Sequence, residues 1–249
     1  MVRRTKADAE VTRHRLLDAA ETLFQAQGVS STSLQQIAAA AGATRGAIYW
    51  HFKDKADLFN AMMDRATLPM ECGFPDLETP AEALEAPLEA LRSGMRYVLH
   101  LIATDERIRR VFEVATHQVE YNAEMAGARE RHLRIRNQYL ELSAQKIAVA
   151  AERAGICLPV PLRSASLGLH IVMDGLLQSW LLDPAAFDLE LVGQHTMDTY
   201  FRGLGFDLAP PPAPAPQRKA AAHGKAAADA APPAPADWPT PAPSQKRTA

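Results

Sequence analysis

With 249 residues, the chain is longer than one small domain requires, and its length suggests two domains, one of them with a substantial core. A formal net charge of −2 at pH 7 argues against a protein that holds nucleic acid through bulk positive charge alone. The two cysteines, Cys72 and Cys157, make no disulfide framework, and neither a signal peptide nor a run of about 18 uncharged apolar residues is evident, so we expect a cytoplasmic protein without a membrane segment.

The first predicted helix spans roughly Asp8 to Ala26 and ends at Gly28, a residue type that commonly closes helices. Its apolar residues recur at the spacing of a single buried stripe: Leu16, Leu17, Ala20, Leu23 and Phe24. Between Arg3 and Arg15, five Lys or Arg stand against two acids. We interpret this basic segment either as a solvated terminus or as an arm that contacts phosphates.

Two short helices with a glycine turn between them are predicted within residues 32–55. The apolar positions of the first recur at helical spacing: Leu34, Ile37 and Ala38. Gly42 can adopt a positive φ and reverse the chain, and Thr44 then offers a hydroxyl cap for a second helix that runs to about Phe52. Ile48 and Phe52, four residues apart, should face the core. This order predicts a helix–turn–helix, whose second helix enters the DNA major groove while the first crosses the phosphate backbone.

The outward side of the second short helix carries groups suited to DNA. Arg45 has a planar guanidinium that matches O6 and N7 of guanine, a contact worth about 1–3 kcal/mol of discrimination. Gly46 lacks a side chain, which allows close approach to base edges, and the aromatic and basic neighbours can donate to phosphate oxygens. The predicted DNA-contacting set is Thr32, Ser33, Thr44, Arg45, Gly46, Tyr49, Trp50, His51 and Lys55. In the alternative interpretation, Arg45 is an ordinary solvated residue and the aromatic run 49–52 belongs to the core.

Residues 1–60 resemble the DNA-binding domain of the TetR family of transcriptional regulators. Residues 44–55, with the sequence TRGAIYWHFKDK, are similar to the efflux-pump repressors grouped with AcrR and TtgR. The resemblance implies that the helix after the turn reads bases and that Tyr49, His51 and Lys55 contact phosphates. It also implies a second domain that holds an effector and a dimer formed by the last two helices.

A fourth helix is predicted from a cap at Asp54 to a point before Pro69, because a proline disfavours helical conformation in the residue that precedes it. Its apolar residues are Leu58, Phe59, Met62 and Met63. We expect this helix to belong to both halves of the molecule. In that position it can transmit a shift from the second domain to the DNA-binding helices.

Five more helices are predicted after a loop at residues 69–79. The first opens with a capping box at Thr79 and Glu82, and Pro87 either kinks it or marks its true start. The others are expected at residues 106–116, at 122–154 up to Gly155, at 162–182 and at 188–203. The charged stretch 129–136 is interpreted as a solvated face with i,i+4 pairs. The last two helices are more apolar than one core needs, so we predict that they pair with those of a second copy.

His170, Asp174 and Gln178 lie at i, i+4 and i+8 on a very apolar predicted helix and should share one face. As a metal site the set is poor, since it has one histidine, one carboxylate and no recognisable third ligand. We interpret it either as a hydrogen-bonded core triad or as the polar anchor of an apolar ligand cavity, with Asp174 as the main anchor and Met173 beside it. The sequence contains no nucleotide-binding loop, zinc spacing or nucleophile elbow, so we expect no cofactor and no enzyme activity.

These features predict an all-α protein of about nine helices, divided into an arm and helix–turn–helix DNA-binding domain at 1–53, a larger helical-bundle ligand-binding and dimerisation domain at 54–206, and a disordered tail at 207–249. Residues 209–249 contain 11 Pro and 15 Ala, too little apolar bulk to fold. The resemblance implies a homodimeric repressor of a multidrug efflux operon that leaves a palindromic operator when a small hydrophobic or amphipathic effector binds. The alternatives are a regulator of unrelated metabolic genes and a helical-bundle enzyme that uses His170 and Asp174.

Overall fold

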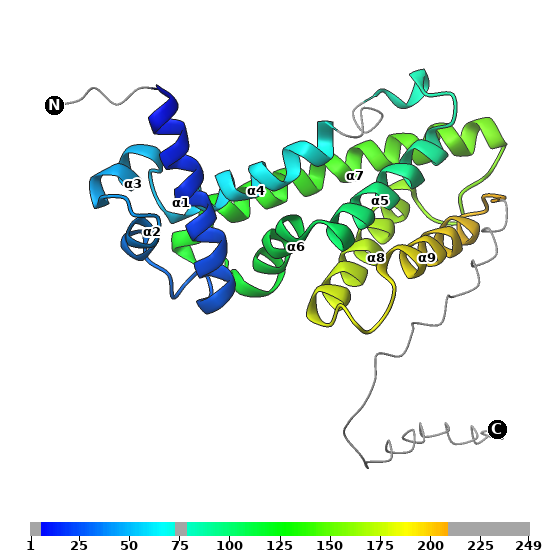
Figure 1. Cartoon of the computed structure of the whole chain (residues 1–249). Helices are drawn as coiled ribbons and strands as arrows, with labels where there is room; N and C mark the ends of the chain where they lie inside the picture. The colour runs from blue at the N-terminus through cyan, green and yellow to red at the C-terminus, as the bar shows by residue number, and fades with distance from the viewer. Residues whose placement is uncertain (1–5, 73–78, 209–249) are drawn as a thin grey trace, which may run out of the picture. The chain divides into compact units, whose positions relative to one another are not determined.

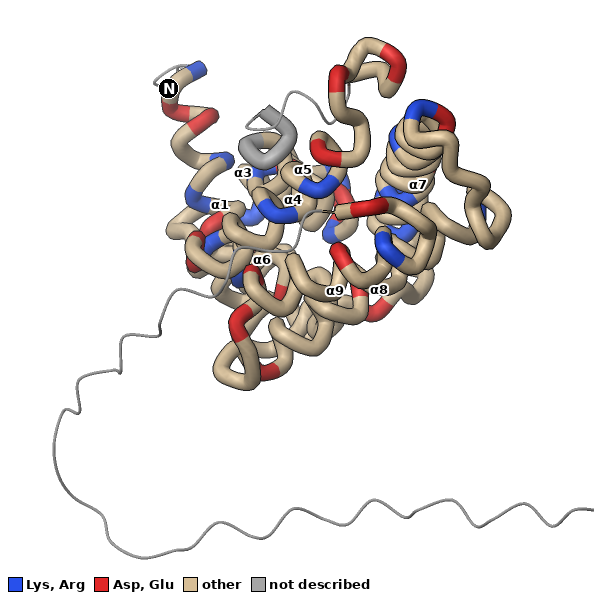
Figure 2. Tube along the Cα trace, turned by 90° about the vertical axis from the view of Figure 1, so that its right-hand side faces the viewer, with Lys and Arg blue, Asp and Glu red and all other residues tan. Residues whose placement is uncertain are grey.

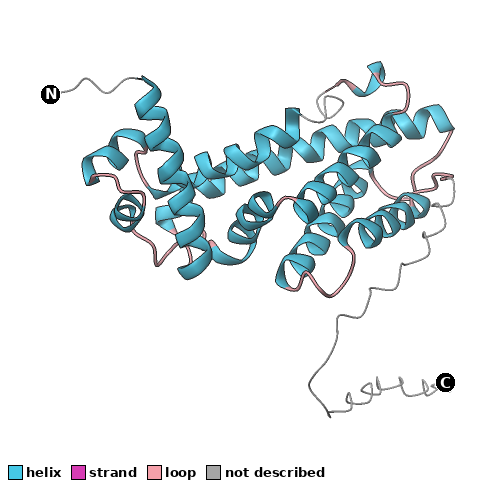
Figure 3. Ribbon diagram, in the orientation of Figure 1, coloured by secondary structure: helices cyan, strands magenta, loops and turns pink. Residues whose placement is uncertain are grey.

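The computed structural model describes residues 6–72 and 79–208, and all regular structure in these ranges is helical (Figure 3). Nine α-helices lie in the two ranges (Figure 1): α1 Lys6–Gln27, α2 Leu34–Ala40, α3 Arg45–His51, α4 Lys55–Cys72, α5 Pro87–Thr104, α6 Glu106–Glu113, α7 Ala126–Ala154, α8 Leu162–Leu182 and α9 Leu189–Gly203. The prediction of an all-α fold with about nine helices is confirmed. From residue 209 onward, the tail predicted to be disordered lies outside the described residues.

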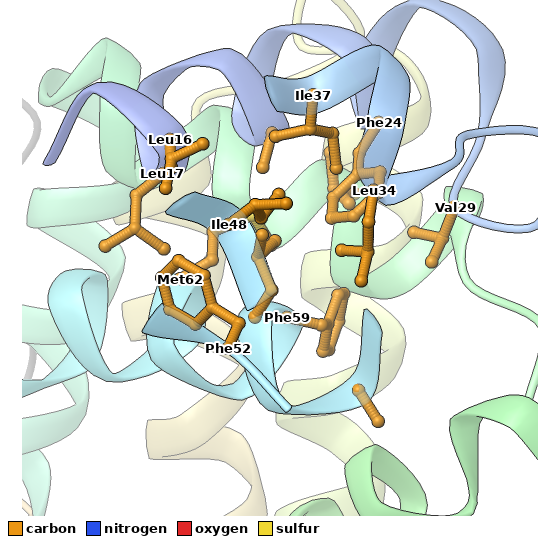
Figure 4. Close-up of a cluster of buried hydrophobic side chains, with 14 of the residues drawn as sticks. Leu16, Leu17, Phe24, Val29, Leu34, Ile37, Ile48, Phe52, Phe59 and Met62 are labelled. Atoms are coloured by element: carbon orange, nitrogen blue, oxygen red, sulfur yellow. The ribbon is translucent and has the colours of Figure 1, made fainter. Parts of the chain in front are cut away.

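Helices α1 to α4 share one hydrophobic core, which we call the head core and which also includes Val111 of α6, Val114, Met125 and Ala128 of α7. Figure 4 shows Leu16 and Phe24 of α1 together with Ile48 of α3, Phe52 directly after α3 and Met62 of α4, and each of these side chains is at most 2 % exposed. Burial of a large apolar side chain contributes about 1.5–3 kcal/mol. The inward stripes predicted for the first and third helices are confirmed, and this packing fixes which side of α3 faces outward.

Side-chain caps fix the starts of α2 and α3, and a glycine makes the turn between them. Ser33 Oγ accepts from the Gln36 backbone N at 3.2 Å, and Gln36 Oε1 accepts from the Ser33 backbone N at 2.8 Å, which completes a capping box. Thr44 Oγ1 accepts from a backbone N of the first turn of α3 at 3.2 Å. Gly42 has φ 62°, and a Cβ there would lie 2.8 Å from Nη2 of Arg15. The positive φ is what favours glycine here, because the guanidinium of Arg15 is the end of a flexible side chain and could move aside.

A second core joins α5, α7, α8 and α9, with Leu99, Ile102 and Phe201 among its fully buried side chains. Inside it, Arg92 of α5 donates to Asp198 Oδ1 of α9 from Nε at 3.0 Å and from Nη2 at 2.6 Å. The Asp198 side chain is 2 % exposed. Removal of one partner of such a buried pair leaves a buried charge, so this contact ties α5 to α9.

Helix α8 contributes Ala165, Leu169 and Trp180 to the second core. Within the described ranges, it is the one helix whose length and composition would also suit a membrane span. Core helices of soluble proteins pass the same test, and α8 packs against α7 and α9. The finding therefore adds no support for a membrane segment.

One helix boundary differs from the prediction, and another decides between two alternatives that the sequence left open. Helix α4 does not end before Pro69 but continues to Cys72. Pro69 lacks an N–H, so one hydrogen bond to the carbonyl four residues earlier is absent, and only three residues of α4 follow it. Helix α5 begins at Pro87, which occupies the first turn, where a missing N–H costs little. The predicted capping box at Thr79 is wrong, because a separate short turn, Ala81–Ala83, precedes α5 without a side-chain cap.

Candidate DNA interface and ligand pocket

Helix α3 presents one side to solvent. We call its exposed residues the α3 face: Thr44, Arg45, Gly46, Tyr49 and Trp50. Trp50 is 74 % exposed, although burial would stabilise so large a side chain. A Cβ at Gly46 would have no atom within 4 Å, so the backbone is open to a close approach there. All five residues of this face belong to the predicted DNA-contacting set.

Arg45 is held by two neighbours. Its guanidinium carbon stands 5.9 Å from the centroid of the Tyr49 ring. The side-chain amide of Gln35 in α2 lies 3.2 Å from both Nε and Nη1 of Arg45, and with its oxygen assigned to that side it accepts from both. The guanidinium is thus oriented before any partner arrives. Gln35 was absent from the predicted set, because only the packing of α2 against α3 brings it to Arg45.

Two predicted DNA contacts instead stabilise the protein itself. Thr32 is 1 % exposed, and its hydroxyl donates to the Gly28 carbonyl at 2.7 Å. Lys55 is 6 % exposed, and its Nζ donates to the Val29 carbonyl at 3.1 Å and to Glu124 Oε2 at 3.0 Å. To reach a phosphate, either side chain would have to leave these partners. Both side chains are engaged within the protein in this structure, and their contact with DNA stays a prediction.

The two other predicted DNA contacts remain near the surface. Ser33 is exposed while it caps α2. His51 is half-buried, and its ring lies 4.6 Å from the Trp50 ring in an edge-on arrangement. Their contact with phosphate stays a prediction.

A cavity of about 330 Å³ lies between α4, α5, α6, α7 and α8. Its wall is largely apolar and includes Met63, Leu91, Met95, Phe112, Leu140 and Met173. Small-molecule sites have volumes of about 300–1,000 Å³ and are mostly apolar with a few placed polar groups. The cavity therefore suits an apolar or amphipathic molecule of modest size.

Three of the four predicted ligand-binding residues line this cavity: His170, Met173 and Asp174. The fourth, Gln178, is exposed and absent from the wall, and its Nε2 donates to Asp174 Oδ2 at 2.9 Å. Helical positions i and i+8 differ by about 80° around the axis, so Gln178 has rotated away from the cavity. The prediction for Gln178 as a wall residue is wrong, and its contact orients Asp174.

Helix α7 adds four basic residues to the wall, and three of them belong to the stretch 129–136 that was interpreted as a solvated face. Arg131, His132, Arg136 and Lys146 line the cavity, and Figure 2, which colours Lys and Arg blue, shows several such positions along α7. Arg131 is 9 % and Lys146 2 % exposed. The interpretation of 129–136 as wholly solvated is therefore wrong. The sequence did hold a signal for this: some of these basic residues lie at helical spacing from apolar residues of the same helix, which places them on its inward face.

The two histidines of the wall are held neutral near pH 7. Burial lowers the pKa of His132 below its ordinary 6.5, against the opposing effect of Asp174, and Arg136 lowers it further. The pKa of His170 is also lowered, by burial first and by Arg136, while Asp174 acts in the opposite direction. Neutral imidazoles can donate and accept hydrogen bonds but add no charge to the cavity.

Helix α4 joins the cavity to the head through two consecutive residues. Asp64 Oδ1 accepts from Nε of Arg131, a residue of the cavity wall, at 2.9 Å. Arg65 donates to Glu21 of α1, which also accepts from Arg107 of α6 at 3.3 Å. Burial raises the pKa of the Glu21 carboxyl, while Arg65 acts in the opposite direction. One side of α4 is thus held by α7 and the other by α1.

Both parts of the chain match known protein families. Residues 16–62 match the family described as bacterial regulatory proteins, tetR family, and residues 86–206 match the C-terminal region of MAATS-type transcriptional repressors. The chain is 38 % identical over 190 residues to the HTH-type transcriptional regulator AcrR of Shigella flexneri, a match that covers 76 % of this chain and 87 % of that protein.

Two solved structures extend the comparison. NalD, the secondary repressor of the MexAB-OprM multidrug efflux pump in Pseudomonas aeruginosa, is 38 % identical with a TM-score of 0.70 and covers 79 % of this chain and 97 % of its own. SmeT of Stenotrophomonas maltophilia, solved in complex with triclosan, is 28 % identical with a TM-score of 0.66. The match covers 81 % of this chain and 99 % of the SmeT chain.

Proposed function

Because the chain belongs to the TetR family of bacterial regulatory proteins, we propose that it represses a multidrug efflux operon and leaves its operator when a small molecule enters the cavity. Its relatives are transcriptional regulators, and it is likewise a regulator and not an enzyme. The efflux target is proposed from NalD and SmeT, which are described as repressors of multidrug efflux pumps and whose chains are each covered to 97 %. The observation that carries the proposal is the pairing, in one chain, of an exposed α3 face with a cavity that α4 connects to it.

The α3 face is the proposed reading surface. Arg45, held by Gln35 and Tyr49, would donate two hydrogen bonds to a guanine. The bare backbone at Gly46 allows the helix to lie deep in the major groove, and Trp50 at its edge would contact the phosphate backbone. Base reading thus depends on Arg45, while the flanking residues set the position of the helix.

The proposed dimer uses apolar surface that α8 and α9 leave exposed. Leu167 and Ile171 lie one turn apart on α8 and are 41 % and 59 % exposed, and Leu182 at the end of α8 is 76 % exposed. On α9, Leu191 is 37 % exposed. A second copy would cover these residues in a symmetric contact. Two heads would then read a palindrome whose half-sites lie about 34–36 Å apart.

The effector is proposed to act through α4. It would bind against Met173, His170 and Asp174, and fill a cavity whose wall includes Arg131. Arg131 holds Asp64, so a molecule that moves the wall also moves α4 and the head attached to it. A ligand shifts such an equilibrium only by its difference in affinity for the two arrangements.

We retain the proposed division at residues 53 and 54, with one refinement. Leu58, Phe59 and Met62 of α4 are buried in the head core, while Met63 and Thr67 of the same helix line the cavity. Helix α4 therefore serves both parts. A regulator that binds operator DNA works in the cytoplasm, and this is the location we propose.

Fluorescence anisotropy with labelled duplexes tests the proposed function. The DNA to use is the intergenic region beside the chain's own gene, with a scrambled duplex of equal composition as the control. We expect the full chain to prefer the intergenic duplex at physiological salt and to release it when an apolar compound fills the cavity. Equal affinity for both duplexes would contradict the proposal.

A further inference from the structure

Residues 114–125 connect α6 to α7, and we call them the α6–α7 connection (Figure 1). The connection begins with a π-helical turn, Val114–Gln118, which packs against both α1 and α8. It ends with a short turn, Ala123–Met125, which packs against α4 and α7. Val114 and Met125 are fully buried in the head core. Because π-helical turns are rare and occur frequently at functional sites, this connection is a candidate for a role beyond linking two helices.

One side of the α6–α7 connection holds the turn between α1 and α2. The backbone N of Val29 in that turn donates to the Gln118 carbonyl at 3.0 Å. Further along the connection, Glu124 Oε2 accepts from Lys55 Nζ at 3.0 Å. Lys55 Nζ also donates to the Val29 carbonyl at 3.1 Å, so Glu124 holds the same turn through Lys55.

The turn between α1 and α2 helps to position the reading helix. It leads directly into α2, which packs against α3. Gln35 of α2 holds the guanidinium of Arg45. A displacement of the turn would therefore be passed through α2 to Arg45.

The other side of the α6–α7 connection reaches the entrance of the cavity. Among the described residues of the wall, only His132 of α7 and Asp174 of α8 are exposed, so the cavity opens to solvent between these two helices. The centroid of the Tyr121 ring lies 5.9 Å from that of the His132 ring. Burial raises the pKa of Tyr121, Arg131 opposes this and Asp174 adds to it, so both charges lie near the phenol. Tyr121 therefore stands at the entrance.

Tyr121 offers apolar surface to a molecule that enters. It is 41 % exposed, and contact with an apolar ligand would bury more of its ring. Gln118 precedes Tyr121 by three residues, and Glu124 follows it by three. The chain between them is braced, since Asn122 Oδ1 accepts from the Met125 backbone N at 3.2 Å. A displacement of Tyr121 would therefore act on the residues that hold the head.

We propose that Tyr121 contacts the effector at the cavity entrance and that the α6–α7 connection carries this contact to the turn between α1 and α2. This inference rests on the proposed function, because it assigns a residue and a route to the effector that would enter the cavity. The route runs through Gln118 and Glu124 and is separate from the contact between Asp64 and Arg131.

Hydrogen–deuterium exchange of residues 28–33 in the full chain tests this route. The probe is N-phenyl-naphthylamine (NPN), an apolar molecule whose fluorescence reports saturation of the cavity. We expect bound NPN to accelerate exchange of the Val29 amide about fivefold, because its hydrogen bond to Gln118 opens more often. At equal saturation, Tyr121→Ala should reduce this change to below about twofold. Val160→Ala, the matched control, shortens an exposed apolar side chain between α7 and α8 and should retain the full change.

A second pair of variants tests the side of the connection that faces the head. Glu124→Gln keeps the shape of the side chain but weakens its hold on Lys55. It should reduce the NPN-induced change at Val29 about as much as Tyr121→Ala does. Glu130→Gln removes an exposed carboxylate of α7 outside the cavity wall and should leave the change at full size.

An unchanged exchange rate at Val29 in the NPN-saturated chain, or the full change in Tyr121→Ala or Glu124→Gln, would overturn the proposal. Operator release measured in parallel separates the route from the repressor function. Release by NPN without a change at Val29 would leave the repressor function standing and refute only the route. A change at Val29 in a chain that shows no preference for its operator would contradict the repressor function alone.

Discussion

Replacement of Asp64 by asparagine tests whether α4 couples the cavity to the head. The amide keeps the shape of the carboxylate but removes the charge that holds Arg131. The Asp64 side chain is 52 % exposed and that of Arg131 is 11 % exposed. An exposed ion pair contributes at most about 1 kcal/mol of stability. A hydrogen bond to a charged group contributes about 1.5–3 kcal/mol. With one partner exposed and the other buried, the Asp64–Arg131 contact should lie between these limits. We expect a loss of about 1–2 kcal/mol of coupling, or about 5- to 30-fold.

The assay is the ratio of operator affinities without and with an apolar compound that fills the cavity and releases the operator. Asp64→Asn should lower this ratio, because the cavity wall and α4 would move less as one unit. Glu106→Gln is the control, since it removes an exposed pair with Arg110 on the surface of α6 and should leave the ratio unchanged. A ratio in Asp64→Asn equal to that of the unaltered chain would refute the role assigned to the Asp64–Arg131 contact.

Three further predictions concern the reading head, the second core and the cavity. Arg45→Ala should weaken operator binding by about 1–3 kcal/mol in anisotropy while affinity for a random duplex changes little, and equal loss on both would show a mere phosphate contact. Arg92→Met leaves the buried carboxylate of Asp198 without its partner and should cost about 3–5 kcal/mol of unfolding free energy in urea titrations, so a loss below about 1 kcal/mol would contradict its burial. Because burial lowers the pKa of His132 and His170 below 6.5, the unfolded chain takes up protons first as the pH falls. The unfolding free energy should therefore be fully retained above pH 6.5 and should decrease below it, and a variant with glutamine at both positions should lack this part of the decrease; superimposable pH profiles would rule the effect out.

The head could be predicted from the sequence because its signals are local. A cap at Thr44, a reversal at Gly42 and an apolar pair at Ile48 and Phe52 each act within a few residues, and all agree on one arrangement. The family resemblance rested on the same stretch, and the comparisons confirm it. What the stretch did not reveal is that Lys55 turns inward, because its partner Glu124 lies far along the chain.

The cavity could be predicted only in part, since its wall is assembled from five helices. Asp174 and His170 were found because polar residues are conspicuous on an apolar helix. Arg131 was missed because it lies in the charged stretch 129–136, and such a stretch on a long helix usually faces solvent. Lys146 lies outside that stretch and was not considered as a site residue. Only the packing of α4, α5 and α8 against α7 encloses both side chains. The start of α5 at Pro87 was left open for a similar reason, because a proline fits both a helix start and a kink.

Selection of bound sequences from a random duplex pool by the full chain tests the central claim most directly. The account predicts enrichment of an inverted repeat whose half-sites are one helical turn apart, with a guanine in each half-site that Arg45→Ala no longer requires. Recovery of sequences without an inverted repeat, or the same enrichment with Arg45→Ala, would contradict it.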